Sequence, residues 1–387
     1  MHQSTILLSN IMLRAGATAL IVTGAALLTI PSARAQTEPL MIARQGYFFV
    51  GGTIDTSREG SPMVGHMYVE FQVPQKASHP YPVVMIHGGS QTGTNFTGTP
   101  DGRLRRGYVV YVVDQVARGR AAQWAQANGP ATAANLARLE QRFVAPERFN
   151  QWPQAHLHTQ WPGTGKPGDP SFDQFYASQF PSLVDFTLQQ ALNRDATAAL
   201  LDRIGPAVLL VHSQSGAFAW PIADKRPSLV KAIVAVEPNG PPAHDVEFKG
   251  APDWFGDNPH LKAYGLVDIP LAYDPPVNNA APLKFAREDK PEQPDYVRCW
   301  AQPEPARKLV NLQNTPILIV TSEASYHAAY DHCTVKYLRQ AGVSVTFTRL
   351  AEQGIHGNGH MMMLEKNSDA IAKLMADWLD HTLEGGP

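Results

Sequence analysis

The chain has 387 residues, of which 44% are hydrophobic and 17% are charged. This composition is typical of a globular protein with a substantial core, and it excludes an intrinsically disordered chain. The formal net charge of -2 gives no electrostatic reason to expect a nucleic acid or an anionic membrane surface as a partner. We therefore expect the chain to act on something other than a polyanion.

Residues 1–35 have the features of a secretory signal peptide. A basic residue precedes an apolar stretch from Ala15 to Ile30, and small residues in an A-x-A cleavage motif end at Ala35. The apolar stretch is shorter than the roughly 20 residues of a membrane span, so an uncleaved anchor is the weaker alternative. We expect a periplasmic or secreted mature chain, residues 36–387, with no membrane attachment after cleavage.

Only two cysteines, Cys299 and Cys333, would meet the oxidising compartment that export implies. A single disulfide between them is the expected arrangement, and two buried free thiols are the alternative. The pair lacks the spacing and the histidine company of a metal knuckle, so no metal is expected there.

Eight apolar runs have the length and composition of β-strands. The first two alternate apolar and polar residues, which suits an antiparallel start at a sheet edge, whereas the others are continuous. Continuous runs are typical of parallel strands that helices cover on both faces. The runs cover residues 47–54, 66–73, 81–89, 108–114, 207–213, 229–237, 315–323 and 344–350.

Helical patterns lie between the later strands, so the predicted fold class is α/β. We expect a mostly parallel, twisted sheet of about eight strands with helices on both faces. The helical patterns cover residues 181–205, 216–225, 333–342 and 368–383.

Two stretches, residues 118–178 and 239–312, do not fit this alternation and are rich in Pro, Trp, Asn and His. Both follow strands, at the end where open α/β sheets bind ligands. We expect them to be excursions from one large domain that form a lid or pocket wall, and long surface loops are the alternative.

The strand at 207–213 runs into the sequence HSQSGA, which contains two serines one residue apart. A nucleophile elbow needs small residues two before and two after its serine. Ser215 has Ser213 and Ala217 at these places, whereas Ser213 follows the β-branched Val211. We therefore expect Ser215 to be the nucleophile and Ser213 to be a small packing residue, with a helix N-cap as the alternative role for Ser215.

Glycines near this serine can supply backbone N–H groups to an oxyanion hole. The strand at 81–89 ends in an HGG turn that contains Gly88 and Gly89, and Gly216 follows the candidate nucleophile at a helix start. We expect these three glycines to face a developing oxyanion.

The glycine-rich segment GIHGNGHMMMLEKN precedes the last helix and carries His356 and His360. A histidine between the final strand and the final helix can meet a serine at the same sheet edge, and we expect His360 to be the base. A metal site made by both histidines with Met361 to Met363 is the alternative. It lacks carboxylate and cysteine ligands, so no metal is expected.

The motifs HGGSQTG, HSQSG, VEPNGPP and GIHGNGHMMMLEKN together resemble an uncommon group of secreted bacterial carboxylesterases in the α/β-hydrolase superfamily. The resemblance covers nearly the whole mature chain and implies the α/β-hydrolase fold, without a cofactor. It implies Ser215 as nucleophile, His360 as base and Glu237 as acid, and a disulfide in the region of Cys299 and Cys333. The chain departs from the superfamily in its elbow, which has no glycine at either flank.

Two glutamates end apolar strands at the correct edge and compete for the role of acid. Glu323, nearer the terminal histidine, has the commoner position for this fold and is the alternative acid. Glu237 closes the strand directly after the nucleophile's helix, and Pro238 stops that strand at once. We therefore expect Glu237 to be the acid.

These features predict an exported serine carboxylesterase that hydrolyses small or medium uncharged carboxylic esters through an acyl-enzyme. An amidase or peptidase with the same triad is one alternative, and a non-catalytic periplasmic binding module on the hydrolase fold is another. No nucleic acid is expected as a partner, and the sequence leaves a homodimer open.

Overall fold

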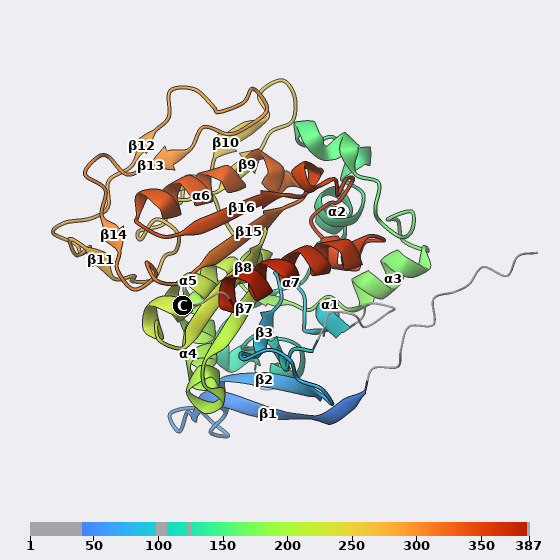
Figure 1. The fold of residues 1–387 in the computed structure, drawn as a ribbon, viewed down its shortest axis with the longest axis vertical. Helices are drawn as coiled ribbons and strands as arrows, with labels where there is room; N and C mark the ends of the chain where they lie inside the picture. Colours follow the sequence, from blue (N-terminus) through green and yellow to red (C-terminus); the bar gives the residue numbers. More distant parts are fainter. Residues whose placement is uncertain (1–40, 98–106, 123–124, 385–387) are drawn as a thin grey trace, which may run out of the picture. The chain divides into compact units, whose positions relative to one another are not determined.

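Eight strands form one sheet in the order β1-β2-β4-β3-β7-β8-β15-β16 (Figure 1). The structure, a computed structural model, describes residues 41–97, 107–122 and 125–384, so the expected signal peptide lies outside the described residues. The predicted antiparallel start is confirmed, because β1 pairs antiparallel with β2 and β2 pairs antiparallel with β4. All other neighbouring strands of this sheet are parallel.

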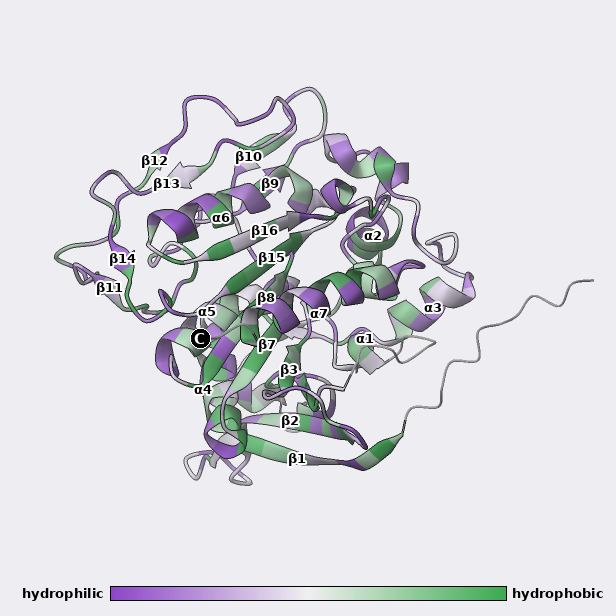
Figure 2. Ribbon diagram, viewed as in Figure 1, coloured by the Kyte–Doolittle hydropathy of each residue, from purple (hydrophilic) through white to green (hydrophobic). Residues whose placement is uncertain are grey.

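The eight predicted strands correspond to the eight strands of this sheet, and the predicted fold class is confirmed. The inner strands β3, β7 and β15 are buried along their whole length, as their continuous apolar runs predict (Figure 2). The strands are β1 (Ile42–Ile54), β2 (Met63–Pro74), β3 (Val83–Ile86), β4 (Val110–Asp114), β7 (Ala207–His212), β8 (Val230–Val236), β15 (Ile317–Thr321) and β16 (Val345–Arg349).

Helices cover both faces of the sheet. Alternate side chains of β7 point to opposite faces: Leu209 packs in a cluster with α4, α5 and α6, and Leu210 packs in a cluster with α1 and α7. No helix in the described part of the chain has both the length and the apolar character that crossing a membrane requires. The helices are α1 (Thr94–Thr97), α4 (Phe186–Ile204), α5 (Gly216–Lys225), α6 (Asp331–Gln340) and α7 (Ser368–Glu384).

The first excursion leaves the sheet after β4 and returns at α4. It has an apolar cluster of its own, in which Phe143, Trp161 and Phe172 pack with Met361 of the histidine loop. Its elements are β5 (Ala131–Thr132), α2 (Leu136–Leu139), a π-helical turn (Glu140–Val144), α3 (Pro170–Ala177), β6 (Ser182–Leu183) and 3₁₀ helices at Gly119–Ala121, Ala125–Asn128, Pro146–Arg148 and Pro153–Leu157.

The second excursion lies between β8 and β15 and contains short antiparallel pairs. Its strands are β9 (Val246–Phe248), β10 (Phe255–Asp257), β11 (Tyr273–Asp274), β12 (Ala286–Arg287), β13 (Trp300–Ala301) and β14 (Lys308–Leu309). The remaining 3₁₀ helices are Ser213–Ser215, Tyr326–Ala329, Leu350–Gln353 and Met362–Leu364.

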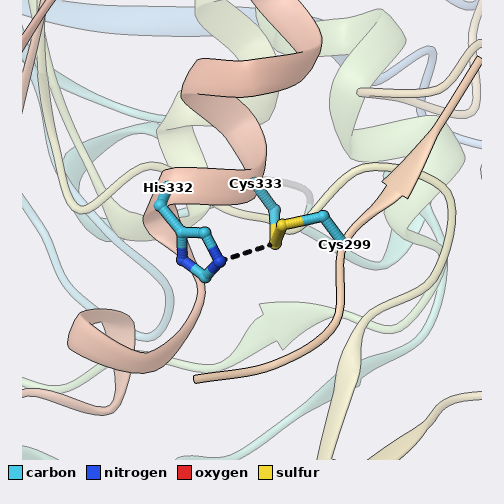
Figure 3. Close-up of side chains that lie close together, drawn as sticks. All are labelled: Cys299, His332 and Cys333. Atoms are coloured by element: carbon cyan, nitrogen blue, oxygen red, sulfur yellow. Dashed lines mark hydrogen bonds between the residues drawn. A yellow bond between two sulfur atoms is a disulfide. The ribbon is translucent and has the colours of Figure 1, made fainter. Parts of the chain in front are cut away.

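The predicted disulfide between Cys299 and Cys333 is present, and both residues are buried (Figure 3). It joins the second excursion, just before β13, to helix α6. The Nε2 atom of His332 lies 3.5 Å from the sulfur of Cys333. Burial and the charge of Lys336 lower the pKa of His332 to about 4. With both sulfurs in the disulfide, this group of side chains has no thiolate with which to hold a metal.

Candidate active site

Ser213 is the first residue after β7, at the turn from the strand into α5. Its φ of +55° lies in the left-handed region, which is strained for a residue with a side chain. The Ser213 Oγ lies 2.9 Å from the Nε2 of His360. The strained turn therefore presents Ser213 to the histidine.

The expectation that Ser215 meets the histidine is wrong. Ser215 is fully buried, and its Oγ lies 2.7 Å from the backbone oxygen of Ile86. The same oxygen atom of Ser215 accepts the backbone N–H of His212 at 2.9 Å. These bonds satisfy the hydroxyl inside the turn, so Ser215 closes the turn, whereas Ser213 reaches His360.

The small residue that this turn requires is Gly216, the first residue of α5. A Cβ placed there would come within 2.6 Å of the Pro238 Cα. Val211, which argued against Ser213 in the sequence, is fully buried in β7 as an ordinary core residue. A better signal was the strand end, because an elbow serine directly follows its strand.

Glu237 directly follows β8 and points its carboxylate at His360. Its Oε2 lies 2.6 Å from His360 Nδ1, and both side chains are fully buried. The carboxylate also accepts the Ser322 backbone N–H at 2.9 Å, the Ser322 hydroxyl, and the Ser325 hydroxyl at 2.7 Å. Because every one of these donors is fixed by the end of β15 and the following turn, the carboxylate is held in one orientation.

The other ring nitrogen of His360 lies between Ser213 and Tyr326. The hydroxyl of Tyr326 is 3.0 Å from His360 Nε2. Burial and the charge of Glu237 raise the pKa of Tyr326, so the phenol stays protonated. Burial lowers the pKa of His360, and the neighbouring His327 and Arg138 act in the same direction. Tyr326 was missed in the sequence, where it has no motif and lies in an unremarkable loop.

Glu323, the alternative acid, does not reach His360. Its Oε2 accepts the backbone N–H of Gly357 at 2.8 Å, and its Oε1 lies 3.1 Å from His356 Nδ1. Glu323 therefore anchors the loop that carries His360. His356 is exposed and its ring bonds to Glu323, whereas the ring of His360 bonds to Glu237. The two histidines therefore have no common partner among the described residues.

The site offers one group of side chains with metal-ligand geometry, made of Glu237, His327 and His360. Both ring nitrogens of His360 already have hydrogen-bond partners. Those of His327 are 2.8 Å from Asp331 and 3.0 Å from the hydroxyl of Tyr330. The ring nitrogens that would bind a metal are already engaged in hydrogen bonds, so this group does not fit a metal.

Arg118 and His87 fix the orientation of the peptide between Gly88 and Gly89. The Gly88 carbonyl accepts Arg118 Nη1 at 3.0 Å and His87 Nδ1 at 2.9 Å. Burial and the charge of Arg118 lower the pKa of His87 to about 3, so its ring is neutral. In a trans peptide the C=O and the following N–H point in opposite directions, so the Gly89 N–H points away from Arg118.

Two of the three expected oxyanion donors are engaged elsewhere, which corrects the expectation for them. The Gly88 N–H donates to the side chain of Gln91 at 3.2 Å. The Gly216 N–H donates back to carbonyls of its own turn. Gly89 remains a candidate, and the structure adds Gln214, because both line the cavity beside Ser213.

A cavity of about 500 Å³ opens at this edge of the sheet. This volume is within the range of about 300 to 1,000 Å³ that is usual for small-molecule sites. Both excursions contribute to its wall, the first through residues such as Arg138 and Arg142 and the second through residues such as Asp245 and Phe248.

The sheet, the strained serine turn, the histidine loop and the buried acid together define an α/β hydrolase. Comparison with known proteins agrees: the model of the alpha/beta hydrolase family matches residues 83–374. A protein named probable secreted lipase phiG, from a fungal species (strain ATCC 74256), is 45% identical over 341 residues. The match covers 86% of this chain and 88% of that protein. The chain belongs to the alpha/beta hydrolase family.

A solved structure shares the fold. It is the atomic-resolution structure of a novel bacterial esterase, with 24% sequence identity and a TM-score of 0.57. The match covers 90% of this chain and 98% of that one.

Proposed function

We propose that this chain is an exported serine hydrolase of small or medium carboxylic esters. The observation that carries the proposal is the hydrogen-bonded series Ser213, His360 and Glu237, with distances of 2.9 Å and 2.6 Å, beside the cavity. The 45% identical relative is named a probable secreted lipase, which supports both the ester chemistry and the export.

In this mechanism His360 Nε2 accepts the proton of the Ser213 hydroxyl while Oγ attacks the acyl carbon of the ester. The imidazolium gives that proton to the departing alcohol, which leaves an acyl-enzyme. A water then loses its proton to His360 and attacks the acyl carbon. The imidazolium returns that proton to Ser213 Oγ as the acid departs, which regenerates the free serine and the neutral histidine. The Glu237 carboxylate at Nδ1 stabilises the imidazolium in both halves of the reaction.

The oxyanion of each tetrahedral intermediate needs donors that are already oriented. We assign this role to the backbone N–H groups of Gly89 and Gln214, which flank Ser213 on the cavity wall. Arg118 is a positioning residue, because it holds the Gly88 carbonyl and thereby aims the Gly89 N–H. It also lies 3.2 Å from the Gln214 side-chain oxygen, so it supports both halves of the hole.

Labelling with a fluorophosphonate tests the nucleophile directly, because the reagent phosphonylates an activated serine. We expect stoichiometric labelling of the wild type and of Ser215→Ala, and no labelling of Ser213→Ala. Labelled Ser213→Ala protein would overturn the assignment. Hydrolysis of p-nitrophenyl esters of graded acyl length, with the matching anilides, tests the reaction class, and faster cleavage of the anilides would favour an amidase.

A further inference from the structure

Two arginines on the cavity wall have no acidic partner among the described residues. Arg138 and Arg142 are four residues apart, in α2 and in the π-helical turn that follows it. The Arg142 Nε donates to the side-chain oxygen of Gln151 at 3.4 Å. Its guanidinium also lies over the ring of Phe248, 5.0 Å from the centroid.

This arrangement is unfavourable in the absence of an anion. Arg138 is exposed and Arg142 is half-buried in the π-helical turn, and like charges on neighbouring turns repel each other. Burial and the charge of Arg138 also lower the pKa of Arg142. A bound carboxylate would offset both effects, since arginine pairs with carboxylates through parallel N–H bonds.

The other charges around the cavity do not neutralise the two arginines. Asp245 is the one acidic residue on the described wall, and its carboxylate is already paired with Lys262 at 2.5 Å. Among the described residues, the Arg118 side chain, behind the wall, bonds to the Gly88 carbonyl and to the side-chain oxygens of Gln189 and Gln214, and to no carboxylate. The cavity therefore presents excess positive charge to a ligand.

The arginines also lie close to the reacting groups. Phe143, next to Arg142 in the sequence, packs against the ring of His360 with a centroid distance of 5.0 Å. The charge of Arg138 acts on His360, and both arginine charges act on Tyr326. Arg138, Arg142 and Ser213 line the same cavity, so a ligand bound there faces both arginines and the serine.

We propose that the substrate is an ester that also carries a carboxylate, which Arg138 and Arg142 bind while the ester carbonyl lies at Ser213. The inference rests on the proposed function and replaces the uncharged ester that the sequence suggested. The carboxylate can belong to the acyl part or to the alcohol part, and the chemistry of recognition is the same for both.

Matched ester pairs test the proposal on the mature protein. Mono-p-nitrophenyl adipate and its methyl ester place the charge on the acyl side, and the longer chain disfavours attack of the carboxylate on its own ester. The compound 4-acetoxybenzoate and its methyl ester place the charge on the alcohol side. In at least one pair we expect the carboxylate to have a kcat/KM about 10- to 100-fold higher, mainly through a lower KM, as for charge-assisted hydrogen bonds. The preference should shrink as salt is added.

Variants assign the effect to the arginines. Arg142→Gln and Arg138→Gln should each lower the ratio of kcat/KM between the charged and the methylated ester, and the double variant should bring it close to one. Arg142→Lys should keep part of the ratio, because it keeps the charge. Arg194→Gln is the matched control, since Arg194 pairs with Asp195 on α4 and does not line the cavity.

The outcomes separate this inference from the proposed function. A ratio of one or below in the wild type in both pairs, with normal hydrolysis of the neutral esters, overturns the carboxylate proposal alone. Loss of the proposed function would appear as p-nitrophenyl acetate hydrolysis that Ser213→Ala does not reduce. Binding of monomethyl adipate to Ser213→Ala, measured by calorimetry, tests the carboxylate site without turnover, because an alkyl ester is stable during the titration. Equal binding by Ser213→Ala/Arg142→Gln would overturn the site.

Discussion

Ser213 and Ser215 are separated by one residue, Gln214, and have opposite environments. The first is strained and faces His360, and the second is buried with its hydroxyl bonded to backbone groups. The size of the neighbouring residues was the wrong criterion for choosing between the two serines. The positive φ of Ser213 arises because this residue directly follows the strand. The expected position of Glu237 beside His360 agrees with the structure. Glu237 ends its strand and is followed by a proline, so the position of its side chain at the sheet edge is fixed.

We expect Ser213→Ala to lose ester hydrolysis by at least about 10⁴-fold in kcat, because removing a triad nucleophile leaves only binding and the oxyanion donors. Ser215→Ala should keep the nucleophile and lose about 1 to 3 kcal/mol of folding free energy, the cost of leaving buried polar groups without a partner. Steady-state kinetics and urea unfolding measure the two effects. A stable but inactive Ser215→Ala beside an active Ser213→Ala would reverse the assignment.

The proposed role of Arg118 in catalysis rests on the Gly88 carbonyl, which accepts Arg118 Nη1 at 3.0 Å. We expect Arg118→Met to lower kcat by about 10- to 100-fold with a smaller change in KM, somewhat less than removal of a complete oxyanion donor. Arg118→Lys should recover part of kcat, because an ammonium can still donate to that carbonyl. Circular dichroism checks that the variants fold. If KM rises by the same factor as kcat falls, Arg118 has a structural role only.

At the scale of elements, His158 connects the first excursion to the histidine loop. Its ring nitrogens lie 2.8 Å from Glu147 and 2.8 Å from Glu365. Glu365 in turn accepts the backbone N–H of Gly359 at 3.0 Å. Although burial opposes it, hydrogen bonds to both carboxylates raise the pKa of His158 to about 9.

A raised histidine pKa stabilises the fold fully below the unfolded value near 6.5, and the stabilisation is lost as pH rises through about 9. Its full size is about 3 kcal/mol. We therefore expect His158→Gln to be less stable than the wild type by about this amount at pH 6 and by much less at pH 10. Urea unfolding at both pH values measures the difference. The same deficit at both values would contradict the charged state of His158.

The disulfide stabilises the link between the second excursion and α6. It closes a sequence separation of 34 residues, for which the chain-entropy model gives about 3 to 4 kcal/mol. We expect the free energy of unfolding of the double variant Cys299→Ser/Cys333→Ser, measured by urea titration, to be lower than that of the wild type by this amount. Unchanged stability, or both thiols free to alkylation in exported protein, would count against it.

At the scale of the whole molecule, the sequence predicted the sheet and its covering helices because each continuous apolar run can only be buried on both faces. It could not predict which side chains the excursions bring to the cavity. Arg142 comes from the first excursion and Tyr326 from the turn after β15, and the two reach the same cavity only in the folded chain. Their sequence neighbourhoods carry no pattern of their own.

The expected export of the chain concerns the molecule as a whole. We expect the mature protein to begin at Gln36, because the A-x-A motif ends at Ala35. Intact-mass measurement of protein recovered from outside the cytoplasm checks this start. Retention of Met1 in that fraction would contradict cleavage.

The disulfide also has a bearing on how preparations of this protein compare. Cys299 and Cys333 pack in one cluster with Phe248, the residue over which the Arg142 guanidinium lies. Ser213 and Glu237 follow β7 and β8, outside this cluster, whereas Tyr326, whose hydroxyl lies 3.0 Å from His360 Nε2, is part of it. We therefore expect chains made in a reducing host to differ from chains made in an oxidising one both in which esters they prefer and in how fast they react. A substrate screen on a single preparation would therefore depend on the oxidation state of Cys299 and Cys333 in that sample as well as on the enzyme itself.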